Sequence, residues 1–141
     1  AETNTTAAGI PGFSSRWLHA TNFGFAIPTG ATIDGVLVEW EGQGSADSGK
    51  AHTISNVHLI KAGTRQSTNK GGAMFFTASS DEWESFGGSS DLWGTTLTPS
   101  DVNDSGFGSA IAVTEENANN AVNVLIDACR ITVYYTEGAG G

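Results

Sequence analysis

The segment from Ala121 to Tyr135 constrains the fold of this chain more than any other part of the sequence. Apolar and polar side chains alternate along it, which is typical of a β-strand with one buried and one solvent-facing side. The apolar side chains change parity near Ala128 and Cys129, and one extra residue in a β-bulge would produce that change. The β-branched and aromatic content of the segment disfavours a helix. Because the segment is long for one strand, we expect it to bend or to join two sheets.

Similar alternation recurs at short intervals, and Gly, Pro, Asn and Asp residues separate the alternating runs. A parity slip between Ile54 and Val57 again suggests an extra residue. The sequence predicts about seven or eight strands, at residues 17–27, 33–41, 52–61, 73–78, 82–86, 91–97, 107–113 and 121–135. The expected fold class is all-β, an antiparallel β-sandwich that is jelly-roll-like. An immunoglobulin-like sandwich is disfavoured because the Cys…Trp…Cys framework is absent.

One short helical turn is predicted near residues 98–104. Thr98 suits the N-cap, Pro99 suits the first helical position, and Asp101 would lie near the positive end of the helix dipole. Gly106 follows too soon to allow more than one or two turns.

The length of 141 residues favours a single domain. We expect a β-sandwich domain at residues 16–137, a flexible N-terminal arm at residues 1–15 and a flexible tail at residues 138–141. An arm that orders on binding would enlarge an interface at a cost in conformational entropy. The apolar residues expected to dock in such an arm are Ile10, Pro11 and Phe13.

The charge content limits the classes of partner. Charged residues make up 15% of the chain, whereas about 25% is usual in soluble domains. The net charge of −9 argues against nucleic-acid binding, which needs clustered Lys and Arg. No apolar run approaches the roughly twenty residues of a membrane-spanning helix, so no membrane segment is predicted.

The histidine and cysteine residues do not form a recognisable metal-binding pattern. His52 and His58 share a parity but lie about 20 Å apart along an extended strand, and His19 belongs to another segment. Cys129 is the single cysteine, so neither an internal disulfide nor a cysteine-based zinc site can form. We interpret Cys129 as a buried structural thiol. The sequence therefore predicts no metal ion and no cofactor.

Acidic residues in two places imitate functional sites. Glu39 and Glu41 would lie roughly 7 Å apart on one strand face, as the carboxylates of a glycosidase do, but alternating Glu is also the ordinary pattern of a solvent-facing strand. The triplet at residues 82–84 has the same interpretation. Residues 101–106 imitate the start of a calcium loop, but Ala112 would occupy the twelfth position and supplies no ligand. A capped helical turn explains this segment better, and no catalytic residues are predicted.

The four tryptophan residues offer candidate contact sites. Trp40 alternates with valines, which predicts a core position. Trp83 and Trp93 flank the Gly/Ser-rich residues 87–90, where partial exposure would allow contacts with a glycan or a protein. Local packing is the third interpretation, and the sequence leaves all three open.

Three groups of residues, taken together, resemble a recurrent small β-module of tailed-bacteriophage virions that occurs in head-decoration and tail-appendage proteins. The groups are Asn22-Phe-Gly-Phe-Ala-Ile-Pro28 with residues 31–36, Asp91-Leu-Trp-Gly94 with residues 101–103 and 106–108, and Ile126-Asp127 with residues 131–135. Their order and approximate spacing match that module across roughly residues 17–136.

The resemblance implies a non-enzymatic structural protein of the virion that decorates or cements a phage capsid. Its expected partners are copies of itself, with a trimer favoured, and other virion proteins such as the major capsid protein. An alternative is a tail-fibre or spike module that recognises host glycan through Trp83 and Trp93. A hydrolase that uses Glu39 and Glu41 ranks last.

Overall fold

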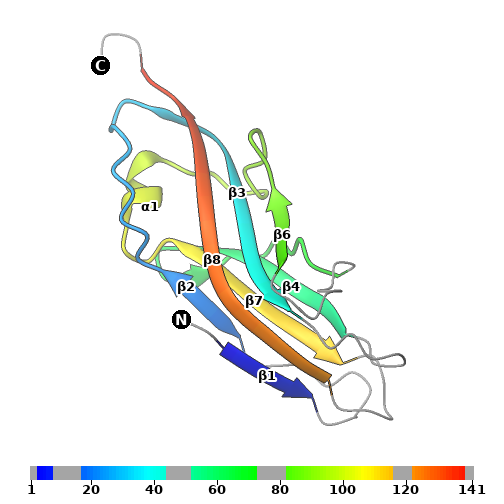
Figure 1. Cartoon of the computed structure of the whole chain (residues 1–141). Helices are drawn as coiled ribbons and strands as arrows, with labels where there is room; N and C mark the ends of the chain where they lie inside the picture. Colours follow the sequence, from blue (N-terminus) through cyan, green and yellow to red (C-terminus); the bar gives the residue numbers. More distant parts are fainter. Residues whose placement is uncertain (1–2, 8–16, 44–51, 73–81, 116–121, 139–141) are drawn as a thin grey trace.

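The computed structural model describes residues 3–7, 17–43, 52–72, 82–115 and 122–138, which are mostly antiparallel β-structure (Figure 1). The strands are β1 (Thr3–Ala7), β2 (Leu18–Thr21), β3 (Thr32–Gln43), β4 (His52–Lys61), β5 (Thr64–Arg65), β6 (Glu82–Gly87), β7 (Gly108–Glu115) and β8 (Val122–Thr136), and the helix is α1 (Pro99–Asn103). Within these ranges no helix has the length and apolar character that crossing a membrane requires.

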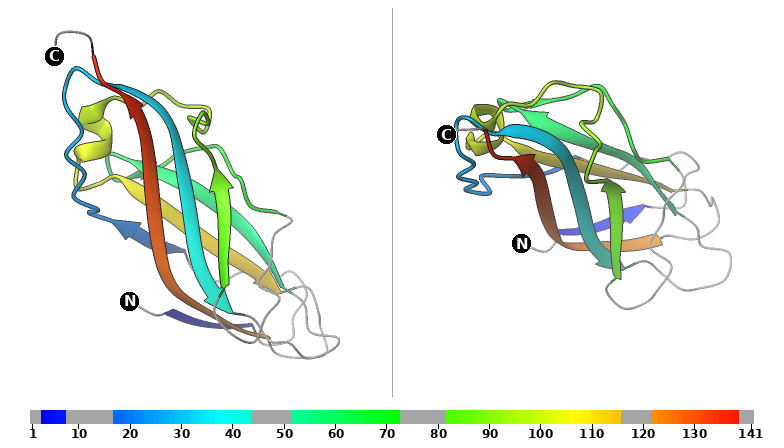
Figure 2. Two further views of the ribbon diagram at one scale, coloured as in Figure 1. Left: turned by 45° about the horizontal axis from the view of Figure 1, so that its top comes forward. Right: turned by 90° about the horizontal axis from the view of Figure 1, so that it is seen from above.

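The strands form two four-stranded sheets with the orders β1-β8-β3-β6 and β2-β7-β4-β5. The first strand therefore pairs with the last, the second with the seventh, the third with the sixth and the fourth with the fifth. Wrapping one long antiparallel hairpin into two layers produces this order, which is that of a jelly roll. Figure 2 shows the two layers from two further sides. The predicted all-β, jelly-roll-like sandwich is confirmed.

Strand β8 has the length and the bulge that the alternation predicted. Its register against β3 shifts because Asp127 is an extra residue between Ile126 and Ala128. Both Ile126 and Ile131 are therefore buried in the core although they are five positions apart, which in a regular strand would place them on opposite faces. The strand stays within one sheet, where it pairs with β1 and β3, and it curves along the length of the molecule (Figure 1).

The parity slip in β4 is also a bulge. Ile54 lies opposite Val113 and Asn56 lies opposite Ala112, so Ser55 is the extra residue. The Ser55 hydroxyl donates a hydrogen bond to the Ala112 carbonyl oxygen at 3.2 Å. The bulge allows both Ile54 and Val57 to face the core, where both are fully buried.

The structure corrects the prediction of a flexible arm at residues 1–15. Thr3–Ala7 forms β1 and pairs with the edge of β8 in antiparallel register. The small polar residues of this segment show no apolar alternation that would predict a strand. Thr nevertheless favours extended backbone, and the free edge of β8 can pair with an extended segment. The expected docking residues Ile10, Pro11 and Phe13 lie outside the described residues, as do the tail residues 139–141.

Two predicted strands are wrong over most or all of their length. Of residues 17–27 only Leu18–Thr21 is a strand, because Asn22 (φ 63°) and Gly24 (φ 77°) take the left-handed conformation that interrupts the pleat. Residues 91–97 contain no strand for the same reason, since the chain turns at Trp93 (φ 56°) and Gly94 (φ 69°). The strand predicted at residues 73–78 lies outside the described residues.

Helix α1 begins as the sequence predicted. The Thr98 hydroxyl accepts a hydrogen bond from the Asp101 amide at 3.2 Å, and the Asp101 carboxylate accepts one from the Thr98 amide at 2.9 Å. At the other end of the helix, the Asn103 side chain accepts from the Ile27 amide at 2.8 Å and donates to the Ile27 carbonyl oxygen at 2.9 Å. The Asn103 amide thus pairs with irregular backbone as a neighbouring strand would.

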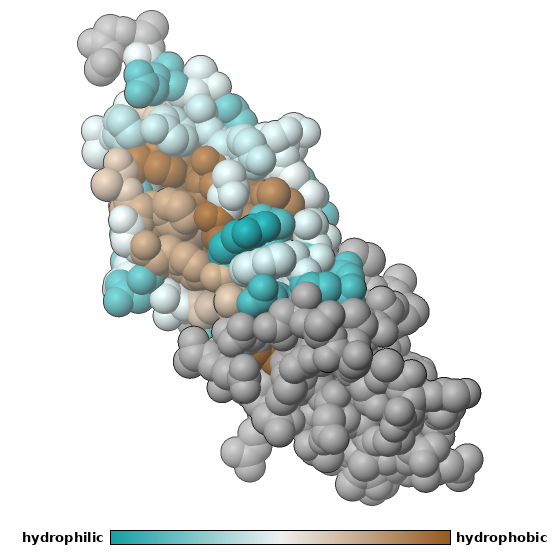
Figure 3. Space-filling view, in the orientation of Figure 1, coloured by the Kyte–Doolittle hydropathy of each residue, from teal (hydrophilic) through white to brown (hydrophobic). Residues whose placement is uncertain are grey.

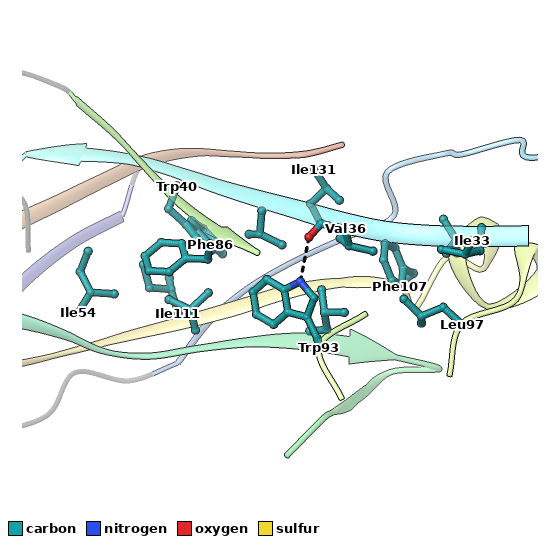
Figure 4. Close-up of a cluster of buried hydrophobic side chains, with 14 of the residues drawn as sticks. Ile33, Val36, Trp40, Ile54, Phe86, Trp93, Leu97, Phe107, Ile111 and Ile131 are labelled. Atoms are coloured by element: carbon teal, nitrogen blue, oxygen red, sulfur yellow. Dashed lines mark hydrogen bonds between the residues drawn. The ribbon is translucent and has the colours of Figure 1, made fainter. Parts of the chain in front are cut away.

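Trp40, Trp93 and Phe107 are the largest side chains in the core between the sheets (Figure 4). The Trp93 indole N–H donates to the Val36 carbonyl oxygen at 2.9 Å, which fastens the turn after β6 to strand β3. Close backbone contact explains Gly108, because a Cβ there would overlap the Ala20 carbonyl oxygen. Val36, Trp93 and Gly108, which belong to the residues that carry the resemblance described above, therefore have roles in core packing and in close backbone contact.

Candidate docking surfaces

The outer face of the sheet β1-β8-β3-β6 carries a row of interacting polar side chains. Arg130, Glu39 and Ser85 are direct neighbours on β8, β3 and β6. The Arg130 guanidinium donates to both Glu39 carboxylate oxygens, at 2.8 and 3.0 Å, and the Ser85 hydroxyl donates to the same carboxylate at 3.4 Å. The hydrogen bond from Arg130 is the main reason that the pKa of Glu39 is lowered, against the opposing effect of partial burial.

The same arginine stacks on a tryptophan. The Arg130 guanidinium carbon lies 4.0 Å from the centroid of the half-buried Trp83 ring, which is the geometry of a cation–π contact. We call Trp83, Arg130 and Glu39 the Trp83 stack. In the view of Figure 3 this face mixes hydrophilic and near-neutral surface, and more apolar surface lies on the flank beside β8.

The outer face of the second sheet, β2-β7-β4-β5, carries a similar cluster. Trp17, directly before β2, is 36% exposed. The Arg65 guanidinium carbon lies 3.8 Å from the Trp17 ring centroid, and the His58 ring meets the same indole edge-on at 5.4 Å. His58 is held in turn by a hydrogen bond from its Nδ1 to the Gln66 carbonyl oxygen at 2.6 Å. We call Trp17, Arg65 and His58 the Trp17 stack.

A cleft of about 400 Å³ opens between the two sheets. Its lining residues are Leu18, His19, Ala20, Thr21, Phe23, Trp40, Ala128 and Cys129. Burial raises the pKa of the Cys129 thiol to about 12, so the thiol stays protonated and is a poor nucleophile at neutral pH. Cys129 itself is half-buried and packs against the core cluster, so a structural role agrees with its surroundings, whereas the full burial expected for it is not observed.

The structure separates the two tryptophans that were candidates for surface contacts. Trp83 lies on an outer face and stays a candidate. Trp93 is only 1% exposed, so its prediction as an interface or glycan contact is wrong. The neighbouring Gly and Ser residues suggested exposure, but the left-handed backbone at Trp93 turns the indole inward, where the Val36 carbonyl oxygen accepts its N–H. The core position predicted for Trp40 is confirmed.

The acidic motifs have structural roles. Glu39 lies on an outer face as expected, where Arg130 binds it. In the segment that imitates a calcium loop, Asp101 caps α1, Asn103 binds the Ile27 backbone, and the Asp104 carboxylate accepts from the Gly106 amide at 2.9 Å. The capped helical turn is therefore confirmed. The parts of the chain that the structure describes contain no group of three or more His, Cys, Asp or Glu residues arranged to hold a metal ion.

The two histidine side chains that the structure describes, those of His19 and His58, do not lie on neighbouring strands. His19 and His58 lie on either side of Ala110 in the second sheet, where His58 contacts Trp17. The side chain of His52 lies outside the described residues. No sequence pattern beyond the presence of Trp and Arg indicates the two stacks, because each stack joins residues far apart in the chain.

Comparisons with known proteins give one distant structural similarity. No protein-family model matches the chain, and no curated protein matches it. A solved structure described as "CBM4 structure and function" aligns with 92% of this chain and 82% of its own, at 14% identity and a TM-score of 0.43.

Proposed function

We propose that this chain is a non-enzymatic structural protein of a phage virion, which decorates or cements a capsid by docking on neighbouring protein subunits and on copies of itself. One observation supports this most directly: each outer face of the sandwich carries a tryptophan stacked against an arginine. Trp and Arg are enriched among the residues that dominate binding energy at protein interfaces. The resemblance to phage virion modules supplies the class of assembly.

The surroundings of the stacks suit protein docking. Tyr134 and Tyr135, near the end of β8, are 36% and 40% exposed and add aromatic contact area. Stacked guanidinium and indole groups lose little conformational freedom on binding, which lowers the cost of association. The acidic net charge would keep free copies apart until a complementary surface is met.

The proposal is tested by sedimenting the purified protein with capsids of its phage that lack decoration. We expect the protein to co-sediment with these heads and to raise their thermal stability. Trp83→Ala should weaken the binding, whereas Thr132→Ala, an exposed substitution on strand β8 of the same sheet, is the matched control. A folded wild-type protein that neither sediments with heads nor stabilises them would contradict the proposal.

A second candidate function is glycan recognition in a tail appendage. The observation that favours it is the exposed Trp17 ring with Arg65 and His58 beside it, since aromatic rings and nearby hydrogen-bond donors are common in ligand sites. Binding on a glycan array that is lost in Trp17→Ala, together with no binding to capsids, would replace the first proposal with this one.

A further inference from the structure

The Lys and Arg side chains in the described residues differ in how their charge is matched. Three of them have a carboxylate within ion-pair distance: Lys61 with Asp101 at 3.8 Å, Lys70 with Asp91 at 2.6 Å, and Arg130 with Glu39 at 2.8 Å. Arg65 is exposed and pairs with no carboxylate in this part of the chain. The difference stands out in a sequence with 15 acidic and 6 basic residues.

The Arg65 side chain is nevertheless held in a defined position. Its guanidinium lies 3.8 Å from the Trp17 ring centroid, and His58 braces the edge of that ring. A guanidinium stacked on an aromatic ring keeps its N–H donors in its own plane, where they match the two oxygens of a carboxylate. Arg65 is thus a pre-positioned donor for an anion that the described residues do not provide.

The Trp83 stack shows what completes such a site. There the arginine also lies on a tryptophan, and Glu39 on the adjacent strand accepts two N–H bonds from it. Among the described residues, the second face has the tryptophan and the arginine but no carboxylate paired with them.

We propose that the Trp17 stack is a docking point for an aspartate or glutamate side chain of a neighbouring protein subunit, an inference that rests on the proposed function. Charge complementarity argues for this occupant, since a carboxylate completes the arrangement seen at Arg130. The Trp17 ring face beneath Arg65 is closed to a stacking sugar, whereas a carboxylate needs only the in-plane donors of the guanidinium.

A single exposed ion pair contributes little in water, so binding of an isolated carboxylate will be weak and needs a site-resolved measurement. NMR of the arginine Nε–H groups provides one, with N-acetyl-glutamate-N-methylamide as the probe and its glutamine counterpart as the matched control. We expect the Arg65 signal, assigned by its loss in Arg65→Lys, to shift saturably with the glutamate compound alone. The Arg130 signal should stay in place.

Glu39→Gln gives the sharpest internal control. Removing the carboxylate from the Trp83 stack should make the Arg130 signal respond to the probe as Arg65 does. Equal responses of Arg65 and Arg130 in the wild-type protein, or an Arg65 response no larger than that to the glutamine compound, would overturn the inference. Saturation by glucuronate without a response to the glutamate compound would instead assign the site to an acidic glycan.

Capsid sedimentation separates this inference from the proposed function. Arg65→Gln should weaken head binding by about tenfold or more, because an ion pair enclosed in an interface contributes more than an exposed one, while the circular dichroism spectrum and thermal unfolding stay those of the wild type. Unchanged head binding by folded Arg65→Gln would remove the inference and leave the proposed function standing. If the wild type fails to bind heads but Arg65 responds specifically in NMR, the proposed function falls and the inference of a carboxylate site at Arg65 stands.

Discussion

The two outer faces of the sandwich carry the same pair of side chains in different electrostatic settings. On one face Arg130 lies on Trp83 and is neutralised by Glu39; on the other Arg65 lies on Trp17 without a carboxylate among the described residues. The stacking distances of 4.0 and 3.8 Å are alike. Stacking on a tryptophan thus holds an arginine side chain in place in both sheets. Whether the N–H donors of that arginine can bind another protein depends on whether an acidic side chain already accepts them.

The largest expected change in the free energy of unfolding comes from a substitution in the core, and the effects expected at the two stacks are smaller. Trp93→Ala would remove a buried indole and leave the Val36 carbonyl oxygen without its partner, at a cost of about 3–5 kcal/mol. Equilibrium urea unfolding measures this cost. A loss as small as that of an ordinary surface substitution would show that the indole is not part of the packed core.

A smaller change, a gain in stability, is expected at the turn that precedes Arg65. Ala62 (φ 53°) and Gly63 (φ 77°) join β4 to β5 with two left-handed residues, as a type I′ turn requires, and Asn tolerates that conformation better than Ala. Ala62→Asn should stabilise the protein by about 0.5–1 kcal/mol in thermal unfolding. Ala62→Val is the matched control and should destabilise it, so equal effects of the two variants would be inconsistent with this turn type.

The Trp83 stack should make the stability depend on pH in the acid range. The pKa of Glu39 lies below its ordinary value of 4.5 because Arg130 binds the carboxylate, so this contribution is present above pH 4.5 and is lost as the pH falls through the lowered pKa. Denaturant midpoints between pH 2 and 7 measure it. Glu39→Gln should show a shallower acid decline than the wild type; parallel curves would argue against a stabilising role for the pair.

The smallest change is expected for the most exposed tryptophan. Trp17→Ala removes a ring that is 36% exposed and lies outside the core cluster, so the free energy of unfolding should change by about 0.5 kcal/mol or less. The same urea titration used for Trp93→Ala measures it. A loss approaching the interior value would mean that Trp17 holds the sheet together and is not available for a partner.

Much of the fold could be predicted because its signals are local. Parity alone located the bulges in β4 and β8, and Thr98, Pro99 and Asp101 located the helix start. Parity also misled, because Phe23 and Phe25 alternate into the core from backbone that is not a strand. Alternating burial of side chains therefore does not by itself establish that a segment is a β-strand.

The candidate site could not be predicted in the same way. Trp83 meets Arg130, and Trp17 meets Arg65, only through the register of strands that are distant in sequence. For Trp93 the small, polar neighbours left surface contact and local packing both open, and only the backbone conformation of the turn shows that the indole points inward.

The pairing of the first strand with the last has a consequence for how the chain is made. Thr3 lies opposite Ile126, so β1 leaves the ribosome long before its partner exists. A topology rich in such distant pairings folds slowly. Until the partner strand is present, the unpaired strand edges can associate with other chains. A nascent chain stalled before β8 should therefore stay protease-sensitive, and the sandwich should close only after β8 has left the ribosome.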